Sequence, residues 1–359
     1  MKKWRSMLVA STLLIAPITA CATPVEQAQE TVDGATEAVA DAVASSRLDA
    51  VKSRGTLVCG VEGTIPGFSF VGSDGAYSGL DVDVCKAVAA AVLGDPEAVE
   101  YRNLDSTERF TALRGGEVDM LARNTTWTLS RDATGGNAME FAPTTFFDAQ
   151  GMMVRANSGI TSLEDFEGRS ICVETGTTTE LNLTSRMSEL GVTYTDVKFQ
   201  EGTEAVEAYL SERCEGFTSD KSQLFARRSQ FDNPDEHILL DVSMSKEPLG
   251  PVTMNNDSQW FDVVKWVTYG LIQAEEFGIT QDNVSEFVSS TDNQDIKNFL
   301  GIGSDLGSQL GIENDFMVKA ISAVGNYGEI YERNIGDGIP RGLNKLWTDG
   351  GLMYAPPAR

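Results

Sequence analysis

Short apolar runs alternate with longer segments of helical periodicity along most of the chain. Residues 56–61 (TLVCGV) form an apolar, β-rich run, and the turn-rich stretch 65–79 after it predicts a hairpin. Residues 80–95 then repeat apolar side chains at the spacing of one helix face, and residues 108–123 combine a second helix pattern, a Gly-Gly stop and the apolar run VDMLA. This alternation predicts an α/β fold with largely parallel strands.

The same order recurs in the second part of the chain. Residues 163–191 give an apolar strand, a Thr-rich loop and a helix, and residues 205–230 give a helix, a turn and a strand–loop–helix unit. From residue 260 onwards a strongly amphipathic helix leads into a helical and loop-rich tail. We therefore expect two α/β lobes with a crevice between them, and a tail that packs on one lobe.

The N-terminal residues carry an export pattern. Residues 1–20 combine a basic start with a short apolar stretch that ends in small residues, as in a secretory signal peptide. Ile18-Thr19-Ala20 before Cys21 resembles the lipobox of bacterial lipoproteins, although ordinary cleavage near Ala20 or Ala22 fits as well. Residues 21–46 are rich in Ala, Glu, Asp and Thr and predict an acidic tether. These features predict that the protein is exported, and we expect it in the periplasm with a membrane anchor through a lipid on Cys21.

The charge of the chain limits its partners. The formal net charge is −25 over 359 residues, and such an acidic surface repels phosphate and anionic lipid. Nucleic acid and bilayer surfaces are therefore poor partners, and the charge favours a soluble monomer. The mean hydropathy of −0.17 excludes a bundle of membrane helices.

Five cysteines fit an exported protein. If Cys21 carries a lipid, four remain, which allow three disulfide pairings in an oxidising compartment. The local pairing, Cys59–Cys85 and Cys172–Cys214, would join a strand to a neighbouring helix in each half, and we expect it. The alternative is that all four are small buried apolar residues. The spacing contains no CxxC or Cys/His cluster, so we expect no metal and no other cofactor.

Catalytic patterns are weak in this sequence. The single histidine, His237, lies in a polar segment, so Ser-His-Asp and Cys-His mechanisms lack a base. No phosphate-binding glycine loop ends in lysine, and no pair of carboxylates stands out among 53 acidic residues. The residues alone therefore give only weak support for an enzyme.

A polar run follows one predicted strand at the end where ligands bind in open α/β sheets. This run, RNTTWTLSRD (123–132), ends in Arg131, whose guanidinium can hold a carboxylate through two parallel hydrogen bonds. The alternative interpretation is that Thr128 or Ser130 caps a helix and Arg131 pairs with a surface acid. Taken alone, the run supports both interpretations almost equally.

Two further segments follow strands in the same way. Thr177 to Glu180 match the capping-box pattern, and a helix that opens after a glycine loop also directs free N–H groups at an anion. Asp220 follows the short strand EGFTS and is a candidate helix N-cap or a partner for a cation. Together these segments offer donors for an anion and an acceptor for a cation, as a zwitterionic amino acid requires.

Several longer motifs carry a family resemblance. GLDVDVCKAVAAAV (79–92) resembles the signature of the solute-binding proteins that serve polar amino-acid ABC transporters. RGTLVCGVEGTIPGFS, the segment from 108 to 132, CVETGTTTELN, LGPVT, AVGNYGEIYERN and GLMYAPPAR resemble the subgroup of general L-amino-acid-binding proteins. The resemblance covers the chain from about residue 53 to its end.

The resemblance implies a type II periplasmic binding protein, in which two α/β lobes joined by two crossover strands close over a ligand and present it to a permease. Lobe 1 would comprise residues 47–149 and 250–359 and lobe 2 residues 150–249, with hinges near 149–154 and 247–252. Departures from the family pattern include Met254, where relatives usually carry a basic residue.

The resemblance also implies residue roles. Arg131 would hold the ligand α-carboxylate beside Thr126 and the backbone N–H of Thr178, and Asp220 would take the α-ammonium with help from Thr126. The remaining residues expected along the pocket are Glu62, Asn124, Phe68 and Thr177. Glu62 would favour cationic or polar ligands over acidic ones. Alternatives on the same fold are a periplasmic dehydratase of cyclohexadienyl amino-acid precursors (arogenate or prephenate), with Glu62 as its acid, and a sensor that docks on a chemoreceptor.

Overall fold

The computed structural model describes residues 46–336 and 338–359. The expected signal segment, Cys21 and the tether up to residue 45 lie outside the described residues. The described part begins at helix α2 (Arg47–Arg54), which Ser46 caps through its side chain. Within this part, no helix is both long enough and apolar enough to span a membrane.

The first sheet holds five strands that come from two distant parts of the chain. Their spatial order is β5 (Val99–Asn103), β1 (Leu57–Val61), β6 (Met120–Leu121), β15 (Val252–Met254) and β7 (Met139–Phe141). Strand β1 pairs in parallel with both neighbours, as the alternation of strand and helix predicts. Strand β15 is antiparallel to β6 and β7, which the pattern did not indicate.

Helices predicted from the first half cover this sheet. Helix α3 (Leu80–Leu93) is Ala- and Val-rich and buried along most of its length, and it ends where Gly94 adopts the left-handed conformation. Helix α4 (Arg109–Gly115) ends in the same way at Gly116. The predicted hairpin is a small three-stranded sheet of β2 (Thr64–Ile65), β3 (Ser69–Val71) and β4 (Tyr77–Ser78).

The second sheet repeats this plan. Its spatial order is β11 (Thr195–Phe199), β10 (Ser170–Glu174), β12 (Gly216–Asp220), β9 (Gln150–Arg155) and β13 (His237–Leu239). Strand β10 is parallel to β11 and β12, and β9 is antiparallel to the central strand β12. The accompanying helices are α6 (Thr178–Leu190), α7 (Gly202–Leu210) and α8 (Lys221–Arg228), and short 3₁₀ turns span Glu164–Phe166 and Pro234–Glu236.

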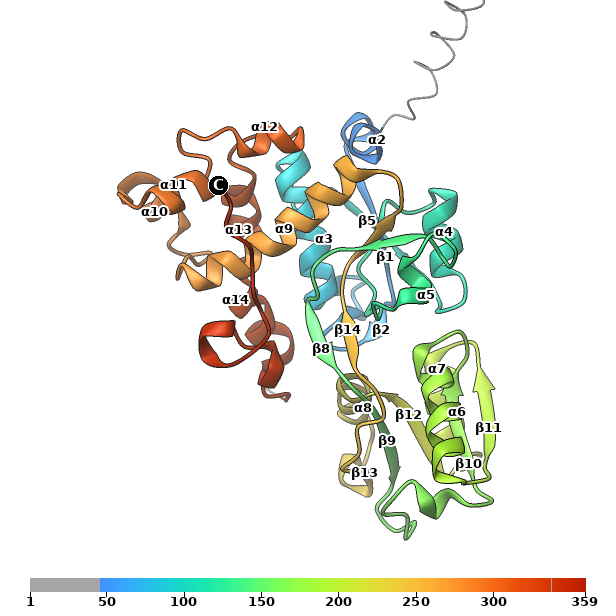
Figure 1. The fold of residues 1–359 in the computed structure, drawn as a ribbon. Coiled ribbons are helices and arrows are strands. Elements are labelled where there is room, and N and C mark those ends of the chain that lie inside the picture. The colour runs from blue at the N-terminus through green and yellow to red at the C-terminus, as the bar shows by residue number, and fades with distance from the viewer. Residues whose placement is uncertain (1–45, 337) are drawn as a thin grey trace, which may run out of the picture. The chain divides into compact units, whose positions relative to one another are not determined.

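Two short strands connect the sheets. Strands β8 (Phe146–Asp148) and β14 (Glu247–Leu249) form an antiparallel pair, in which Glu247 lies opposite Asp148, and they run side by side in Figure 1. The chain passes from the first sheet to the second after β8 and returns after β14. The two-lobed fold with two crossover strands is therefore confirmed, whereas the lobe boundaries at 149/150 and 249/250 and the two hinges stay predictions.

The C-terminal tail extends the core of the first lobe. Its elements are α9 (Ser258–Glu276), α10 (Val284–Ser290), α11 (Gln294–Phe299), α12 (Leu306–Leu310), α13 (Phe316–Val324), α14 (Tyr327–Tyr331), a π-helix (Glu332–Gly336) and 3₁₀ turns at Gly342–Asn344 and Trp347–Asp349. Helices α9 and α13 pack on α3 and bury their apolar faces in one cluster with the β1 side chains. This is the packing on one lobe that the amphipathic pattern predicts.

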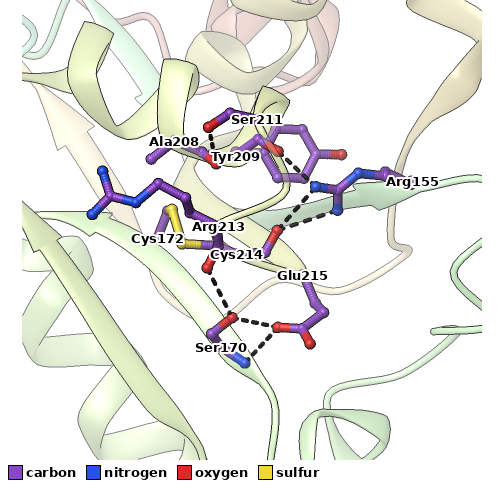
Figure 2. Close-up of a disulfide and its surroundings, with 9 residues drawn as sticks. All are labelled: Arg155, Ser170, Cys172, Ala208, Tyr209, Ser211, Arg213, Cys214 and Glu215. Carbon is purple, nitrogen blue, oxygen red and sulfur yellow. Dashed lines mark hydrogen bonds between the residues drawn. A yellow bond between two sulfur atoms is a disulfide. The ribbon is translucent and has the colours of Figure 1, made fainter.

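Both expected disulfides are present. Cys59 in β1 bonds to Cys85 in α3, and Cys172 in β10 bonds to Cys214, just after α7. Around the second disulfide, the Arg155 side chain donates hydrogen bonds to the backbone carbonyls of Cys214 and Tyr209 (Figure 2). The covalent bond and these hydrogen bonds fix the end of α7 to its own sheet.

We expect the second disulfide to contribute strongly to stability. It closes a loop of 42 positions, so the double substitution Cys172→Ser/Cys214→Ser should lower the free energy of unfolding by about 4 kcal/mol through the larger entropy of the unfolded chain. Urea unfolding of the oxidised wild type and the double variant measures the difference. Equal unfolding midpoints and slopes would contradict the expectation.

Candidate functional site

The three polar segments predicted from the sequence converge on one cavity. They follow β6, β10 and β12 at the carboxyl ends of these strands, and the cavity lies between the first two segments and Asp220. Its lining residues are Arg109, Arg123, Asn124, Thr126, Arg131, Glu174, Thr177, Thr178, Thr179, Ser219, Asp220 and Gln223. The position is the one that open α/β sheets commonly use for ligands.

Arg131 is buried, and no acidic side chain in the described part of the chain pairs with it. Its side chain lies on the single turn of α5 (Leu129–Asp132), is 7 % exposed, and donates from Nη1 to the Thr126 carbonyl at 2.9 Å. No carboxylate among the described residues lies within ion-pairing distance of it, and burial lowers its pKa to about 10. The surface ion pair considered as an alternative does not form, and Thr128 makes no side-chain cap hydrogen bond.

The start of α6 presents backbone donors to the same cavity. The Thr177 hydroxyl accepts a hydrogen bond from the Glu180 backbone N–H at 3.1 Å and so caps the helix. The Glu180 carboxylate accepts from Gly176 N–H at 2.9 Å instead of reaching back to Thr177, so only half of the expected capping box forms. Thr178 is the first helical residue, where backbone N–H groups have no acceptor within the helix.

Asp220 lies at the N-cap position of α8 but does not cap it. Its side chain is 5 % exposed, and Oδ2 accepts from the Gln223 amide at 2.9 Å. Burial raises its pKa well above the usual range, and the neighbouring acids Asp148 and Glu247 raise it further. The carboxyl therefore lines the cavity instead of capping the helix. A cation bound beside it would offset the cost of burying its negative charge.

Sequence reasoning missed two arginines of this cavity. Arg123 opens the polar run 123–132, donates from Nε to the Leu104 carbonyl, and lies 3.6 Å from the Glu174 carboxylate. Arg109 lies in α4, is 3 % exposed, and its Nε has no hydrogen-bond partner among the described residues. Burial lowers its pKa well below the usual value, and nearby Arg131 and Arg123 lower it further. Arg123 could have been predicted from the sequence, because it belongs to the polar run 123–132. Arg109 could not, because it lies within a helix pattern and nothing in that pattern distinguishes a buried arginine from an exposed one.

Two expected pocket residues lie outside this cavity. The Glu62 carboxylate lies 3.4 Å from the Arg227 guanidinium in an ion pair that is buried on both sides. Its charge is therefore compensated by Arg227, and the expected preference of Glu62 for cationic or polar ligands stays a prediction. Phe68 is fully buried and packs edge-on against Phe146 at 5.1 Å between ring centroids.

Asn124 does line the cavity, in an unusual backbone conformation. Its φ angle is 36°, and its backbone N–H donates to Asp81 Oδ2 at 2.9 Å. The Oδ1 atom of its side chain is buried and has no partner among the described residues. A buried acceptor that lacks a donor is costly, so this amide is suited to meet a ligand donor.

Polar contacts cross between the loops of the two sheets around the cavity. Ser106 Oγ donates to the Thr175 carbonyl at 2.7 Å, and the Gln200 amide donates to Asp105 at 2.6 Å. The pairs Arg123–Glu174 and Arg227–Glu62 also join side chains from different sheets. These contacts hold the two walls of the cavity together.

The described residues give no basis for metal chemistry. Over residues 46–336 and 338–359, no group of three His, Cys, Asp or Glu side chains could hold a metal ion. His237 lies away from the cavity, where its Nδ1 is 2.8 Å from the Tyr209 hydroxyl. The cavity described above instead offers charged and hydrogen-bonding side chains, which suit a small zwitterionic ligand.

Comparison with known proteins identifies relatives over most of the chain. The chain is 49 % identical over 326 residues to the general L-amino acid-binding periplasmic protein AapJ of Rhizobium johnstonii, which covers 89 % of this chain and 95 % of that protein. It is 46 % identical to the glutamate/glutamine/aspartate/asparagine-binding protein BztA of Rhodobacter capsulatus, with 89 % and 96 % covered.

A solved structure shares the fold. It is a periplasmic binding protein of an ABC transporter from Brucella ovis with glutathione bound, at 46 % identity and a TM-score of 0.84, covering 88 % of this chain and all of that one. The model of the bacterial extracellular solute-binding proteins, family 3, matches residues 57–337. These relatives are solute-binding proteins and not enzymes, so the dehydratase alternative has no support. The chain belongs to family 3 of the bacterial extracellular solute-binding proteins.

Proposed function

We propose that this protein binds a free L-amino acid and delivers it to an ABC importer, with Arg131 on the α-carboxylate and Asp220 on the α-ammonium. The observation that carries the proposal is the buried Arg131 guanidinium, which has no acidic partner among the described residues and lines the same cavity as the buried Asp220 carboxyl. Both groups are costly to bury unpaired, and a zwitterion satisfies both at once. The Thr178 backbone N–H adds a donor for the carboxylate, and the Thr126 hydroxyl lies beside it and helps Asp220 with the ammonium.

The relatives support the ligand class. AapJ is a general L-amino-acid binder by its name, and BztA binds glutamate, glutamine, aspartate and asparagine by its name. Their identity to this chain of nearly one half over almost the whole length makes the same ligand class and the same transport partner the natural proposal here.

Closure of the lobes would bury the ligand. Arg131 lies in the first lobe, whereas Thr178 and Asp220 belong to the second, so a ligand that touches all three stabilises only a closed arrangement. We place the hinges at residues 149–154 and 247–252, where β8 and β14 continue into the sheets. The contacts between Ser106 and Thr175 and between Gln200 and Asp105 would form on closing.

We further propose that Arg109 selects the ligand side chain. It is a second buried cation without an ion pair among the described residues, at the cavity that Arg131 also lines. Once the α-carboxylate is bound to Arg131, Arg109 can donate hydrogen bonds to a side-chain carboxylate or amide oxygen of the ligand. Acidic amino acids and their amides therefore suit the cavity better than cationic ones, in contrast to the preference expected from Glu62.

Calorimetric titration of residues 47–359 with a panel of L-amino acids tests the function and the selectivity. We expect Arg109→Leu to lose about tenfold or more in affinity for glutamate and aspartate, since a hydrogen-bonded charge is removed, and to keep affinity for alanine within about threefold. Wild type that binds no amino acid would contradict the function, and an equal loss for glutamate and alanine would contradict the selectivity.

We also propose that the chain is exported, loses residues 1–20 and acts as a monomer tethered to the membrane through a lipid on Cys21. The basic start, the apolar stretch and the small residues before Cys21 support this proposal, as do the two disulfides. The periplasmic placement of the relatives agrees with export.

A further inference from the structure

A buried carboxylate lies directly behind the proposed amino-acid site. Glu247 belongs to the connecting strand β14, is 1 % exposed, and has no ion-pair partner among the described residues. Its side chain does not line the cavity, but two residues that do, Thr126 and Thr178, lie in front of it. A buried charge that pairs with no other charge must be held by hydrogen bonds.

The two oxygens of this carboxylate accept hydrogen bonds from four neutral side chains. Oε2 accepts from the Thr126 hydroxyl at 2.5 Å and from the Thr178 hydroxyl at 2.9 Å. Oε1 accepts from the Asn182 amide at 2.8 Å and from the Ser245 hydroxyl at 2.5 Å. Because Thr126 follows β6 and Thr178 and Asn182 lie in α6, the one carboxylate joins both lobes at the connecting strand.

The direction of these hydrogen bonds fixes the polarity of the two threonines. A hydroxyl has one proton to donate and lone pairs to accept, and a carboxylate can only accept. Thr126 and Thr178 therefore give their protons to Glu247 and keep only lone pairs for the cavity. A hydroxyl whose proton is already donated can accept a hydrogen bond from a ligand, but it cannot donate one to it.

We propose that Glu247 is a positioning residue that makes the cavity selective for ligands with an α-ammonium group. It turns the Thr126 and Thr178 hydroxyls into hydrogen-bond acceptors. Together with Asp220, these acceptors match the three N–H donors of an ammonium group. They have no donor for the carbonyl oxygen that replaces the ammonium in a 2-oxo acid. The inference rests on the proposed function and adds the reason why amino acids would be chosen over the corresponding 2-oxo acids.

The test compares an L-amino acid with the 2-oxo acid of the same side chain, for example L-glutamate with 2-oxoglutarate, by calorimetric titration. Glu247→Gln keeps the size of the side chain but brings an amide N–H₂ that donates to a threonine and frees its proton for the cavity. We expect the variant to lose about tenfold or more in affinity for the amino acid and to bind the 2-oxo acid no more weakly than wild type does. The ratio of the two affinities is the readout, because a merely structural defect lowers both together.

Three further variants separate the effect of the threonine hydroxyls from a general structural defect. Thr126→Val removes one hydroxyl and should shift the ratio in the same direction, and Thr126→Ser should restore it. Thr184→Ala removes an exposed hydroxyl of α6 that donates to the Glu180 carbonyl and makes no hydrogen bond to Glu247, and it should leave the ratio unchanged. An unchanged ratio in a folded Glu247→Gln variant overturns this inference alone, whereas wild type that binds no amino acid overturns the proposed function with it.

Discussion

Replacing Arg131 with alanine should abolish detectable binding of every amino acid that the wild type binds. The substitution removes the fork that holds the carboxylate common to all of them, and the loss of one partner of a buried charge pair costs about 2–5 kcal/mol. A micromolar ligand would then need about 30-fold to several-thousand-fold higher concentration, beyond ordinary calorimetry. Titration with the full panel measures the effect.

Arg186→Ala provides the matched control for this experiment. Arg186 lies on the exposed side of α6 and pairs with Glu189 at 3.0 Å, so its removal changes the net charge equally without touching the cavity. Arg131 also donates to the Thr126 carbonyl, and thermal unfolding must show that the alanine variant is folded. A folded Arg131→Ala protein that binds within about threefold of wild type would exclude Arg131 as the carboxylate site.

Asp220→Asn should weaken amino-acid binding about 30-fold or more, since it removes the only charge that we assign to the ammonium while keeping the shape of the side chain. Binding should also depend on pH. Burial raises the pKa of Asp220 well above its usual value, and a bound ammonium would favour the ionised carboxyl. Affinity in the wild type should therefore rise with pH through that pKa, and binding below it should release a proton.

Titration in buffers of different ionisation enthalpy measures this proton release. The Asp220→Asn variant should show a flat pH profile and no release from this site. Asp235→Asn is the control, because Asp235 is exposed in the same lobe and lies 3.6 Å from Arg228 at the surface. Proton release that persists in Asp220→Asn would assign the titration to another group.

Periodicity predicted most of the fold, and the strand ends indicated the segments that meet at the candidate cavity. The alternating pattern placed β1, α3, β10, α6 and β12 within a few residues, because these elements bury apolar faces and end at glycines or polar loops. Arg131, Thr178 and Asp220 were singled out for a related reason, since each lies at or after the end of a strand, where parallel sheets bring their loops together.

Partners that are distant in sequence could not be predicted in this way. The ion pair of Glu62 with Arg227 joins residues from different lobes, and no local pattern relates them. The burial of Arg109 depends on the surroundings of α4, whose short length gives a weak pattern. Glu247 entered only as the end of an expected hinge, because its hydrogen bonds to Thr126 and Thr178 span more than sixty positions.

The insertion of β15 between β6 and β7 has a consequence for the order of synthesis. The second sheet holds all its strands within residues 150–239, so it is complete as soon as that stretch of chain exists. The first sheet waits for residues 252–254, and α3 waits for α9 and α13 to cover it. The first lobe is therefore the first to be synthesised but the last to have all its strands and helices. A chain that stops before α13 leaves the apolar face of α3 uncovered.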